Sequence, residues 1–258
     1  MRSASRSATV PVGDQTAADV LRRRHDAWEG RPLTREVYRR YFEAVVTELA
    51  AGPRTVELGG GAGNFKTYYA PARVSDIVST PFVDFVADAM CLPLADGSID
   101  NLVMVDVLHH LPHPSRLFVE SQRVLRVGGR LIMVEPYISP MSRLVFGVAH
   151  PEPVDLSADP LPDDDRAVFE AGGPFASNQA IPTLLFMRHR ARFERRFPRL
   201  AIRACRLDSV LVYPLSGGFS GPRLLPGFAA GAAWRLERCL LPLRRWLAFR
   251  LLVTLEKT

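Results

Sequence analysis

A glycine-rich segment is the part of the sequence whose residue types most directly suggest chemistry. Residues 57–63 read Glu-Leu-Gly-Gly-Gly-Ala-Gly and lead from a short predicted strand over residues 55–58 to a helical pattern over residues 64–70. Glycines in such a turn permit positive φ angles and let the backbone approach a ligand without a Cβ clash. Open parallel sheets bind nucleotide-like ligands at turns of this kind. The segment therefore predicts a binding loop.

Spacing separates three loop chemistries. The dinucleotide pattern G-x-G-x-x-G fails, because in either register the third position is not glycine but Asn64 or Lys66. The phosphate-binding pattern G-x-x-x-x-G-K-[ST] nearly fits residues 60–67, but Phe65 replaces the glycine before the lysine and would obstruct the wrap of amides around a phosphate. We therefore rank that interpretation lower. The remaining pattern is acid-x-G-x-G-x-G, filled by Glu57, Gly59, Gly61 and Gly63.

The elements around this loop alternate between strands and helices. Further strands are predicted over residues 74–78, 85–87, 99–105, 130–134, 202–213 and 249–256. Helices are predicted over residues 16–51, 64–70, 115–125 and 183–197. This order indicates an α/β fold: a Rossmann-like, doubly wound, seven-stranded and mostly parallel sheet with helices on both faces and an N-terminal helical extension.

Residues 137–182 break the alternation. They are rich in proline and include the acidic run 163–165, so they read as a lid or insertion after the fifth strand. We expect residues 1–15 to be a disordered lead-in and residues 16–258 to form one domain. Its parts would be a cofactor-binding core over 54–136, the lid, and a C-terminal part over 183–258 that completes the sheet and faces the substrate.

Charge is unevenly distributed. The 258 residues hold 33 Lys+Arg against 27 Asp+Glu, a net charge of +6, yet residues 182–258 alone carry +11. Such a basic segment can meet an anionic membrane, a nucleic acid or an acidic substrate, or be an ordinary solvated surface. Nucleic acid is not expected, because no recognition module is present.

Membrane and compartment signals are weak. The N-terminus lacks the apolar core of a secretory signal, and three scattered cysteines suit a reducing cytoplasm. Residues 239–255 are apolar but interrupted by proline and arginine, so they fall short of the roughly 20 residues that span a bilayer. We interpret them as a core helix and a core strand, with peripheral contact to an anionic membrane surface as the alternative.

Four segments, in order within residues 54–136, resemble the class I S-adenosylmethionine-dependent methyltransferases, of the small-molecule type with a methyltransferase domain 11-like sequence. Residues 57–63 resemble the family's first motif, 88–100 its segment from strand three into strand four, 105–111 its motif at the end of strand four, and 123–131 its helix, Gly-Gly turn and fifth strand. The resemblance implies S-adenosyl-L-methionine as cofactor.

The resemblance also implies roles for single residues. The loop at Gly59, Gly61 and Gly63 would pass under the methionine part of the cofactor, with Glu57 orienting it. Asp76 would accept from the ribose hydroxyls, although the short span to the next strand leaves the register uncertain and makes Asp84 a rival. Asp88, with Ala89 and Met90, would contact the adenine. Asp106 would face the sulfonium or the acceptor.

Methyl transfer chiefly requires alignment and exclusion of water, and a base is needed only for a weakly nucleophilic acceptor. His109 and His110, at the end of the fourth strand, are the candidates for that base, and Glu135, Tyr137 and His150 are candidates to line the acceptor pocket. No cysteine and histidine set has metal-ligand spacing, so no metal is expected.

The acceptor is not named by the sequence. Aromatic and arginine residues after residue 186 favour a lipophilic or anionic small molecule, glycan or lipid-linked acceptor. A noncatalytic cofactor-binding partner protein of the same fold and, lower, a P-loop-like nucleotide enzyme are the alternatives.

Overall fold

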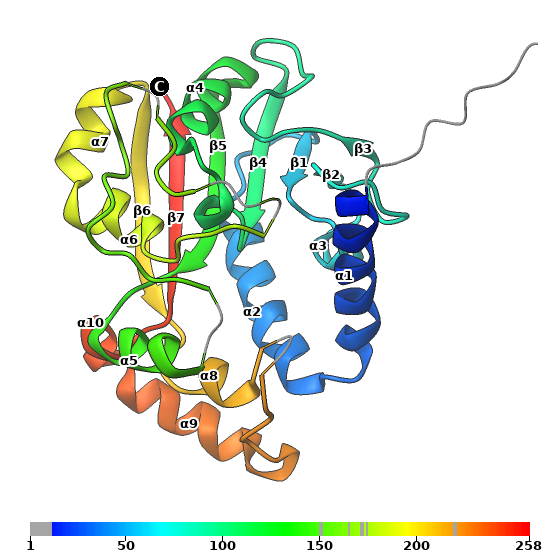
Figure 1. The fold of residues 1–258 in the computed structure, drawn as a ribbon, viewed down its shortest axis with the longest axis vertical. Coiled ribbons are helices and arrows are strands. Elements are labelled where there is room, and N and C mark those ends of the chain that lie inside the picture. Colours follow the sequence, from blue (N-terminus) through cyan, green and yellow to red (C-terminus); the bar gives the residue numbers. More distant parts are fainter. Residues whose placement is uncertain (1–11, 150–151, 165, 171–172, 174, 219–220) are drawn as a thin grey trace, which may run out of the picture.

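The computed structural model describes residues 12–149, 152–164, 166–170, 173, 175–218 and 221–258. Its centre is a seven-stranded sheet in the order β3-β2-β1-β4-β5-β7-β6 (Figure 1). The strands are β1 (Thr55–Leu58), β2 (Arg73–Asp76), β3 (Phe85–Val86), β4 (Ile99–Val105), β5 (Leu125–Pro136), β6 (Leu200–Asp208) and β7 (Arg250–Lys257). The first five pair in parallel, and only β7 runs antiparallel to its neighbours β5 and β6. The predicted mostly parallel seven-stranded sheet is confirmed.

Helices cover both faces of this sheet (Figure 1). They are α1 (Val12–Glu29), α2 (Pro32–Glu48), α3 (Asn64–Tyr68), α4 (Pro114–Val124), α5 (Pro140–Ala149), α6 (Ile181–Thr183), α7 (Arg190–Arg196), α8 (Val212–Ser216), α9 (Ala230–Leu240) and α10 (Arg244–Leu247). Shorter turns are η1 (Leu108–His110), the π turn η2 (Leu184–Arg188), η3 (Gly227–Ala229) and η4 (Leu241–Leu243).

The central strand β4 shows why both faces must be covered. Its side chains alternate, so Leu102 and Met104 pack into one apolar cluster with Phe118 of α4, while Val103 packs into another with Phe65 of α3. A strand buried on both sides reads as a continuous apolar run, which is what residues 102–105 of β4 show. The carboxyl ends of β1, β4 and β5 therefore meet at one edge, between the two helical layers.

Several predicted boundaries were wrong. The single helix over 16–51 is two helices, because Pro32 occupies the first turn of α2 and starts a new helix after Gly30. The lead-in is shorter than expected, since α1 begins at Val12; residues 1–11 lie outside the described residues. The sixth strand ends at Asp208, because Ser209 has φ 62° and breaks the extended backbone.

The interpretation of residues 239–255 as a core helix and a core strand is half right. Strand β7 is buried, but Leu243 and Trp246 in the helical part are 51% and 65% exposed. The helical turns therefore lie on the surface. None of the helices in the described ranges combines the length and the hydrophobicity needed to cross a bilayer.

Candidate active site

The glycine-rich loop lies at the carboxyl end of β1, between the ends of β2 and β4. Gly59 and Gly63 adopt positive φ angles of 73° and 70°, which favour glycine. A Cβ on Gly59 would come within 2.5 Å of Val107, which follows β4. On the other side, the Gly60 amide donates to the Ser75 carbonyl of β2 at 3.0 Å. The predicted loop therefore forms, held against both neighbouring strands.

Asp76, the last residue of β2, fixes the middle of the loop. Its Oδ2 accepts from the Gly61 amide at 2.9 Å and its Oδ1 from the Val78 amide at 2.8 Å. A Cβ on Gly61 would come within 2.6 Å of that Oδ2, so the glycine is required by the close approach. Burial raises the pKa of Asp76. The carboxylate stands where a ribose-binding acid is expected, but here it holds backbone amides.

Glu57 lies in the interior beneath the loop. Its side chain is 5% exposed, and its Oε2 has no hydrogen-bond partner within the described residues. Burial, with the neighbouring Asp76 charge, raises the pKa of Glu57 to about 8. A buried carboxyl oxygen without a donor suits a cationic or hydrogen-bond-donating group of a ligand, such as an ammonium.

Helix α1 covers the loop, a contact that no pattern in the sequence predicts. The His25 Nδ1 hydrogen-bonds the Ala62 carbonyl at 2.9 Å, and its ring stacks on Phe82 at a centroid distance of 3.9 Å. Leu21 packs so close that a Cβ on Gly61 would come within 2.6 Å of it. The N-terminal helix is thus a wall of the site rather than an appendage.

The segment after β3 forms a tight turn. Asp88 Oδ1 accepts from the Met90 amide at 2.8 Å, Ala89 is buried and Met90 half-buried. The rival acid Asp84 is occupied elsewhere: Lys66 Nζ lies 2.6 Å from its Oδ1, and the Val74 amide donates to it at 2.8 Å. All three acids of this side thus accept hydrogen bonds from backbone amides, and Asp84 in addition pairs with Lys66.

Glu135, near the end of β5, organises the turn that follows β4. It is fully buried, and its Oε1 accepts from the amides of Val107 and Leu108 at 2.9 and 2.8 Å. Its Oε2 lies 2.7 Å from Nδ1 of His109. One carboxylate thus joins the ends of two adjacent strands and fixes one imidazole.

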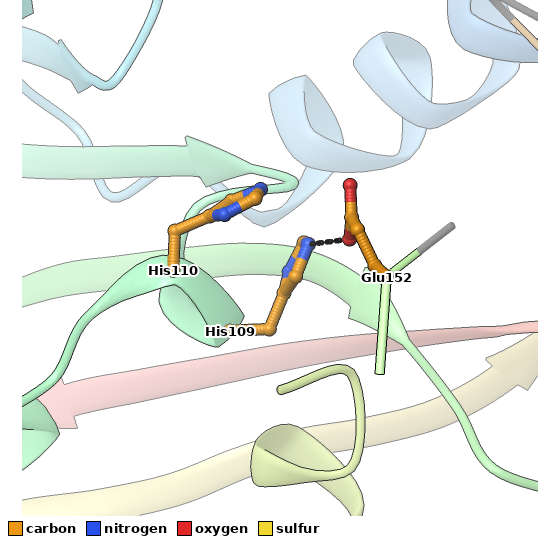
Figure 2. A group of neighbouring side chains, drawn as sticks. All are labelled: His109, His110 and Glu152. Atoms are coloured by element: carbon orange, nitrogen blue, oxygen red, sulfur yellow. Dashed lines mark ion pairs between the residues drawn. The ribbon is translucent and has the colours of Figure 1, made fainter. Parts of the chain in front are cut away.

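The two histidines have different surroundings (Figure 2). His109 is 3% exposed and lies between two carboxylates, because its Nε2 is 3.3 Å from Glu152. Burial favours its neutral form, but Glu135 and Glu152 outweigh burial and raise the pKa of His109 to about 9. Burial and the charged His109 lower the pKa of His110 to about 4. His110 hydrogen-bonds the Ala176 carbonyl through Nδ1 at 3.1 Å.

These side chains also form the group most suited to a metal ion in the described part of the chain. His109, His110 and Glu152 each offer one ligand atom, and the three atoms lie within 4.8 Å of one another. Glu152 comes from the predicted lid, more than 40 residues beyond the histidines in sequence, so spacing alone did not reveal the cluster. Two imidazoles and one carboxylate bind divalent transition metals in other proteins, but here both ring nitrogens of His109 already face carboxylates.

Asp106, the first residue after β4, belongs to an internal polar network. It adopts φ 60°, and its Oδ2 accepts from the Tyr38 hydroxyl at 2.7 Å and from Arg250 Nη2 at 3.1 Å. Arg250 also donates to the Tyr213 hydroxyl at 2.9 Å. Although burial opposes it, the Arg250 charge lowers the pKa of Asp106. Asp106 and Arg250 together therefore link α2, α8 and β7 beside the histidines.

The part of the chain that matches known proteins contains the glycine-rich loop and the turn after β4. Residues 56–133, from β1 into β5, match the model of a family described as "Methyltransferase domain". Over this part the chain is therefore similar to methyltransferase domains. The resemblance found in the four sequence segments is thereby confirmed.

Relatives of the methyltransferase domain include two proteins named "uncharacterized methyltransferase". One, from Mycobacterium bovis (strain BCG / Pasteur 1173P2), is 31% identical over 124 residues, which are 42% of this chain and 49% of that protein. The other, from Mycobacterium ulcerans (strain Agy99), is 32% identical over 120 residues, 40% and 47% of the two chains. The chain spans about half the length of the curated relatives it matches.

The fold likeness extends beyond that domain core. A Thermotoga maritima structure, described as a SAM-dependent methyltransferase and possible histamine N-methyltransferase, covers 95% of this chain and 98% of its own. The TM-score is 0.52 at 16% identity, so the likeness concerns the fold alone.

The fold brings most of the predicted site residues to one edge of the sheet, and the roles assigned to them stay predictions. His150 lies outside the described residues. The sequence reasoning missed Glu152, Tyr38 and Arg250. Arg250 had a signal, because an arginine inside an apolar strand must find a buried partner. Glu152 had none, since it comes from an irregular segment.

Proposed function

We propose that this chain transfers the methyl group of S-adenosylmethionine to a small-molecule, glycan or lipid-linked acceptor. The observation that carries the proposal is the glycine-rich loop between β1 and α3, flanked by Glu57 and Asp76, within the part that matches the methyltransferase family. The loop, the two acids and the β4 turn lie together at the carboxyl edge of a parallel sheet, where such folds bind ligands.

The residues present fit the cofactor. Glu57 keeps a buried oxygen without a partner among the described residues, which suits the ammonium of the methionine part. Asp76 and Asp88 would hold the ribose and adenine parts, with Ala89 and Met90 beside the ring. When bound, S-adenosylmethionine supplies a methyl group on a positively charged sulfur that needs no further activation. The chain's task is then to orient the acceptor and exclude water.

His110 is the better candidate for a base where the acceptor is a hydroxyl. Its Nδ1 faces a carbonyl oxygen, which only accepts, so that nitrogen carries the proton and Nε2 keeps the lone pair in the neutral ring. His109 differs, because both of its nitrogens lie beside carboxylates and its pKa is raised to about 9. His109 would position the β4 turn and His110 would accept the proton.

The P-loop alternative loses support from the structure. Phe65 is fully buried in an apolar cluster, and the Lys66 ammonium pairs with Asp84 rather than standing over the loop. The second alternative, a cofactor-binding protein without turnover, shares the fold and the loop with the leading proposal. It differs only in the absence of an acceptor.

Calorimetry with S-adenosylmethionine and with ATP tests the proposal. We expect binding of the sulfonium cofactor and none of ATP, and absence of cofactor binding at millimolar concentration would overturn it. Asp88→Ala should weaken cofactor binding by about 1–3 kcal/mol if a buried contact is lost. Asp96→Ala is the matched control, because Asp96 is 80% exposed and lies before β4, at the opposite edge of the sheet. Labelled cofactor added to cell extracts then reports the acceptor, or its absence for the noncatalytic alternative.

A further inference from the structure

Exposed apolar side chains recur along the surface helices near the C-terminus. From η3 through α9 and η4 to α10, helical turns follow one another with few interruptions. Their spacings of four, four, three, four and three residues keep them on one side of a helical path. We call this set the α9–α10 stripe: Phe228, Ala232, Leu236, Cys239, Leu243 and Trp246.

The exposure of the stripe is large. Phe228 is 93% exposed and Trp246 65%, while Leu236 and Leu243 are each 51% exposed. The opposite side of α9 makes its contacts with the protein, through the buried Ala233 and Glu237. A helix that packs one side inward and leaves a separate apolar side in water calls for a second partner.

Helix α5 adds a second stripe beside the first. Met141, Leu144 and Val148, spaced three and four residues apart, are 40%, 64% and 83% exposed. Helices α5 and α10 pack against each other, and α9 lies next to them at the same end of the molecule (Figure 1). The two stripes therefore belong to one region of the surface.

The charges in this region are all of one sign at the surface. Between residues 221 and 247 the exposed charged side chains are five arginines: Arg223, Arg235, Arg238, Arg244 and Arg245. The one acid in that span, Glu237, is buried, where it accepts from the amides of Val210 and Val212. Apolar side chains flanked by arginine, without exposed acids, are typical of helices that lie in a membrane interface.

We propose that α5, α9, η4 and α10 form a docking surface for an anionic lipid bilayer, with the helices lying in the interface plane. The stripe would enter the acyl boundary, Trp246 would sit at the headgroup level, and the arginines would meet anionic headgroups. A second copy of the chain fits less well, because a two-fold contact would bring like-charged arginine clusters together. The proposal is independent of methyl transfer.

The docking surface adjoins the candidate active site. Helix α5 begins four residues after Pro136 closes β5, and α10 ends three residues before Arg250, which binds Asp106. Docking would place the carboxyl edge of the sheet near the lipid headgroups. This position suits the lipid-linked class among the proposed acceptors.

Vesicle sedimentation of the full chain tests the proposal. We expect binding to vesicles of phosphatidylcholine with phosphatidylglycerol, weaker binding to phosphatidylcholine alone, and a decrease with added salt. Arg244→Ala with Arg245→Ala should lower the affinity about 30-fold, from about 1 kcal/mol per arginine near an anionic surface. The matched control is Arg195→Ala with Arg199→Ala, two exposed arginines away from these helices, which should bind as the unchanged chain does.

A second set of variants tests the apolar part. Leu243→Ser with Trp246→Ser should abolish sedimentation, whereas Val127→Ser, at another exposed apolar side chain (67%), should not. Trp fluorescence should shift to shorter wavelength on adding anionic vesicles, and the shift should be lost in Trp246→Phe. Cofactor calorimetry on each variant reports that the fold is kept. No sedimentation of the unchanged chain, equal loss in the controls, or a dimer in ultracentrifugation that Leu243→Ser with Trp246→Ser dissociates would each overturn the proposal.

Discussion

At the scale of single residues, Glu57 is the carboxyl group of the site that burial most disfavours as a charged group. Its pKa is raised to about 8 from an ordinary 4.5, because its burial and the Asp76 charge both disfavour ionisation. Between these two values the folded state holds a proton that the unfolded state has released. Stability should therefore fall as pH rises from 4.5 to about 8, and a cationic ligand group would relieve the cost.

Glu57→Gln should remove this part of the pH dependence. The variant should be more stable than the parent near pH 8, by an amount on the order of a few kcal/mol, and equal to it near pH 4.5. Urea unfolding across that pH range measures the difference. A constant difference at all pH values would show that Glu57 ionises normally in the folded chain. The variant should also bind S-adenosylmethionine more weakly, since the carboxylate is lost.

His110 and His109 should separate in kinetics, because only His110 is placed to accept a proton. With a hydroxyl acceptor found in the extract screen, His110→Ala should lower kcat about 10²–10⁴-fold and leave cofactor affinity unchanged. Added imidazole should restore part of the rate. His109→Ala instead removes the partner of two carboxylates, so it should lower the thermal stability as well. An unchanged kcat in His110→Ala would remove His110 from the mechanism.

The same contacts predict that the site works without a metal. Both ring nitrogens of His109 lie beside carboxylates, which requires protons on both and leaves no lone pair for a cation. Chelation should change neither the thermal stability nor the rate of the purified chain. A stoichiometric transition metal that is lost in His110→Ala would contradict this and make the trio with Glu152 a metal site.

At the scale of elements, the central strands could be predicted from the sequence. The packing of α1 against the glycine-rich loop could not. Residues 55–58 and 99–105 form strands with the predicted bounds, because strands buried on both faces are rich in apolar residues. The contact of α1 with the glycine loop rests on Leu21 and His25, which have nothing unusual in sequence. Glu152 likewise reaches His109 only because the lid folds back. Such contacts depend on the packing of distant segments.

The loop element gives a matched pair of glycine substitutions. Gly61→Ala would place a Cβ within 2.6 Å of Asp76 and Leu21, so it should destabilise the fold and weaken cofactor binding together. Gly231→Ala lies in α9 with nothing within 4 Å of the new Cβ, and should stabilise the chain by about 0.5–1 kcal/mol. Thermal unfolding and calorimetry measure both. Equal effects would show that the loop is not packed as described.

At the scale of the whole molecule, the positive charge of the C-terminal part is partly neutralised by ion pairs with acids from earlier segments. Arg206 pairs with Glu48 at 2.9 Å, and Arg192 with Asp159 at 2.7 Å, so part of the +11 of residues 182–258 meets acids from earlier elements. Five exposed arginines that pair with no acid among the described residues lie beside the α9–α10 stripe: Arg223, Arg235, Arg238, Arg244 and Arg245. The sequence predicted the excess of positive charge but not which arginines would be paired, because the pairs of Arg192 and Arg206 join segments distant in sequence.

The pair of Arg250 and Asp106 ties the last strand to the centre of the sheet and to α2, and it should behave as a coupled unit. Arg250→Met leaves the Asp106 carboxylate without its cation beside Tyr38, so it should cost about 3–5 kcal/mol of unfolding free energy. Asp106→Asn keeps a side chain that tolerates the positive φ, and the double variant removes both charges. The double variant should therefore be less destabilised than the sum of the single ones, by 1 kcal/mol or more in a urea-unfolding cycle. Strict additivity would mean that the two charges do not interact in solution, and that β7 is held by its ladder to β5 and β6 alone.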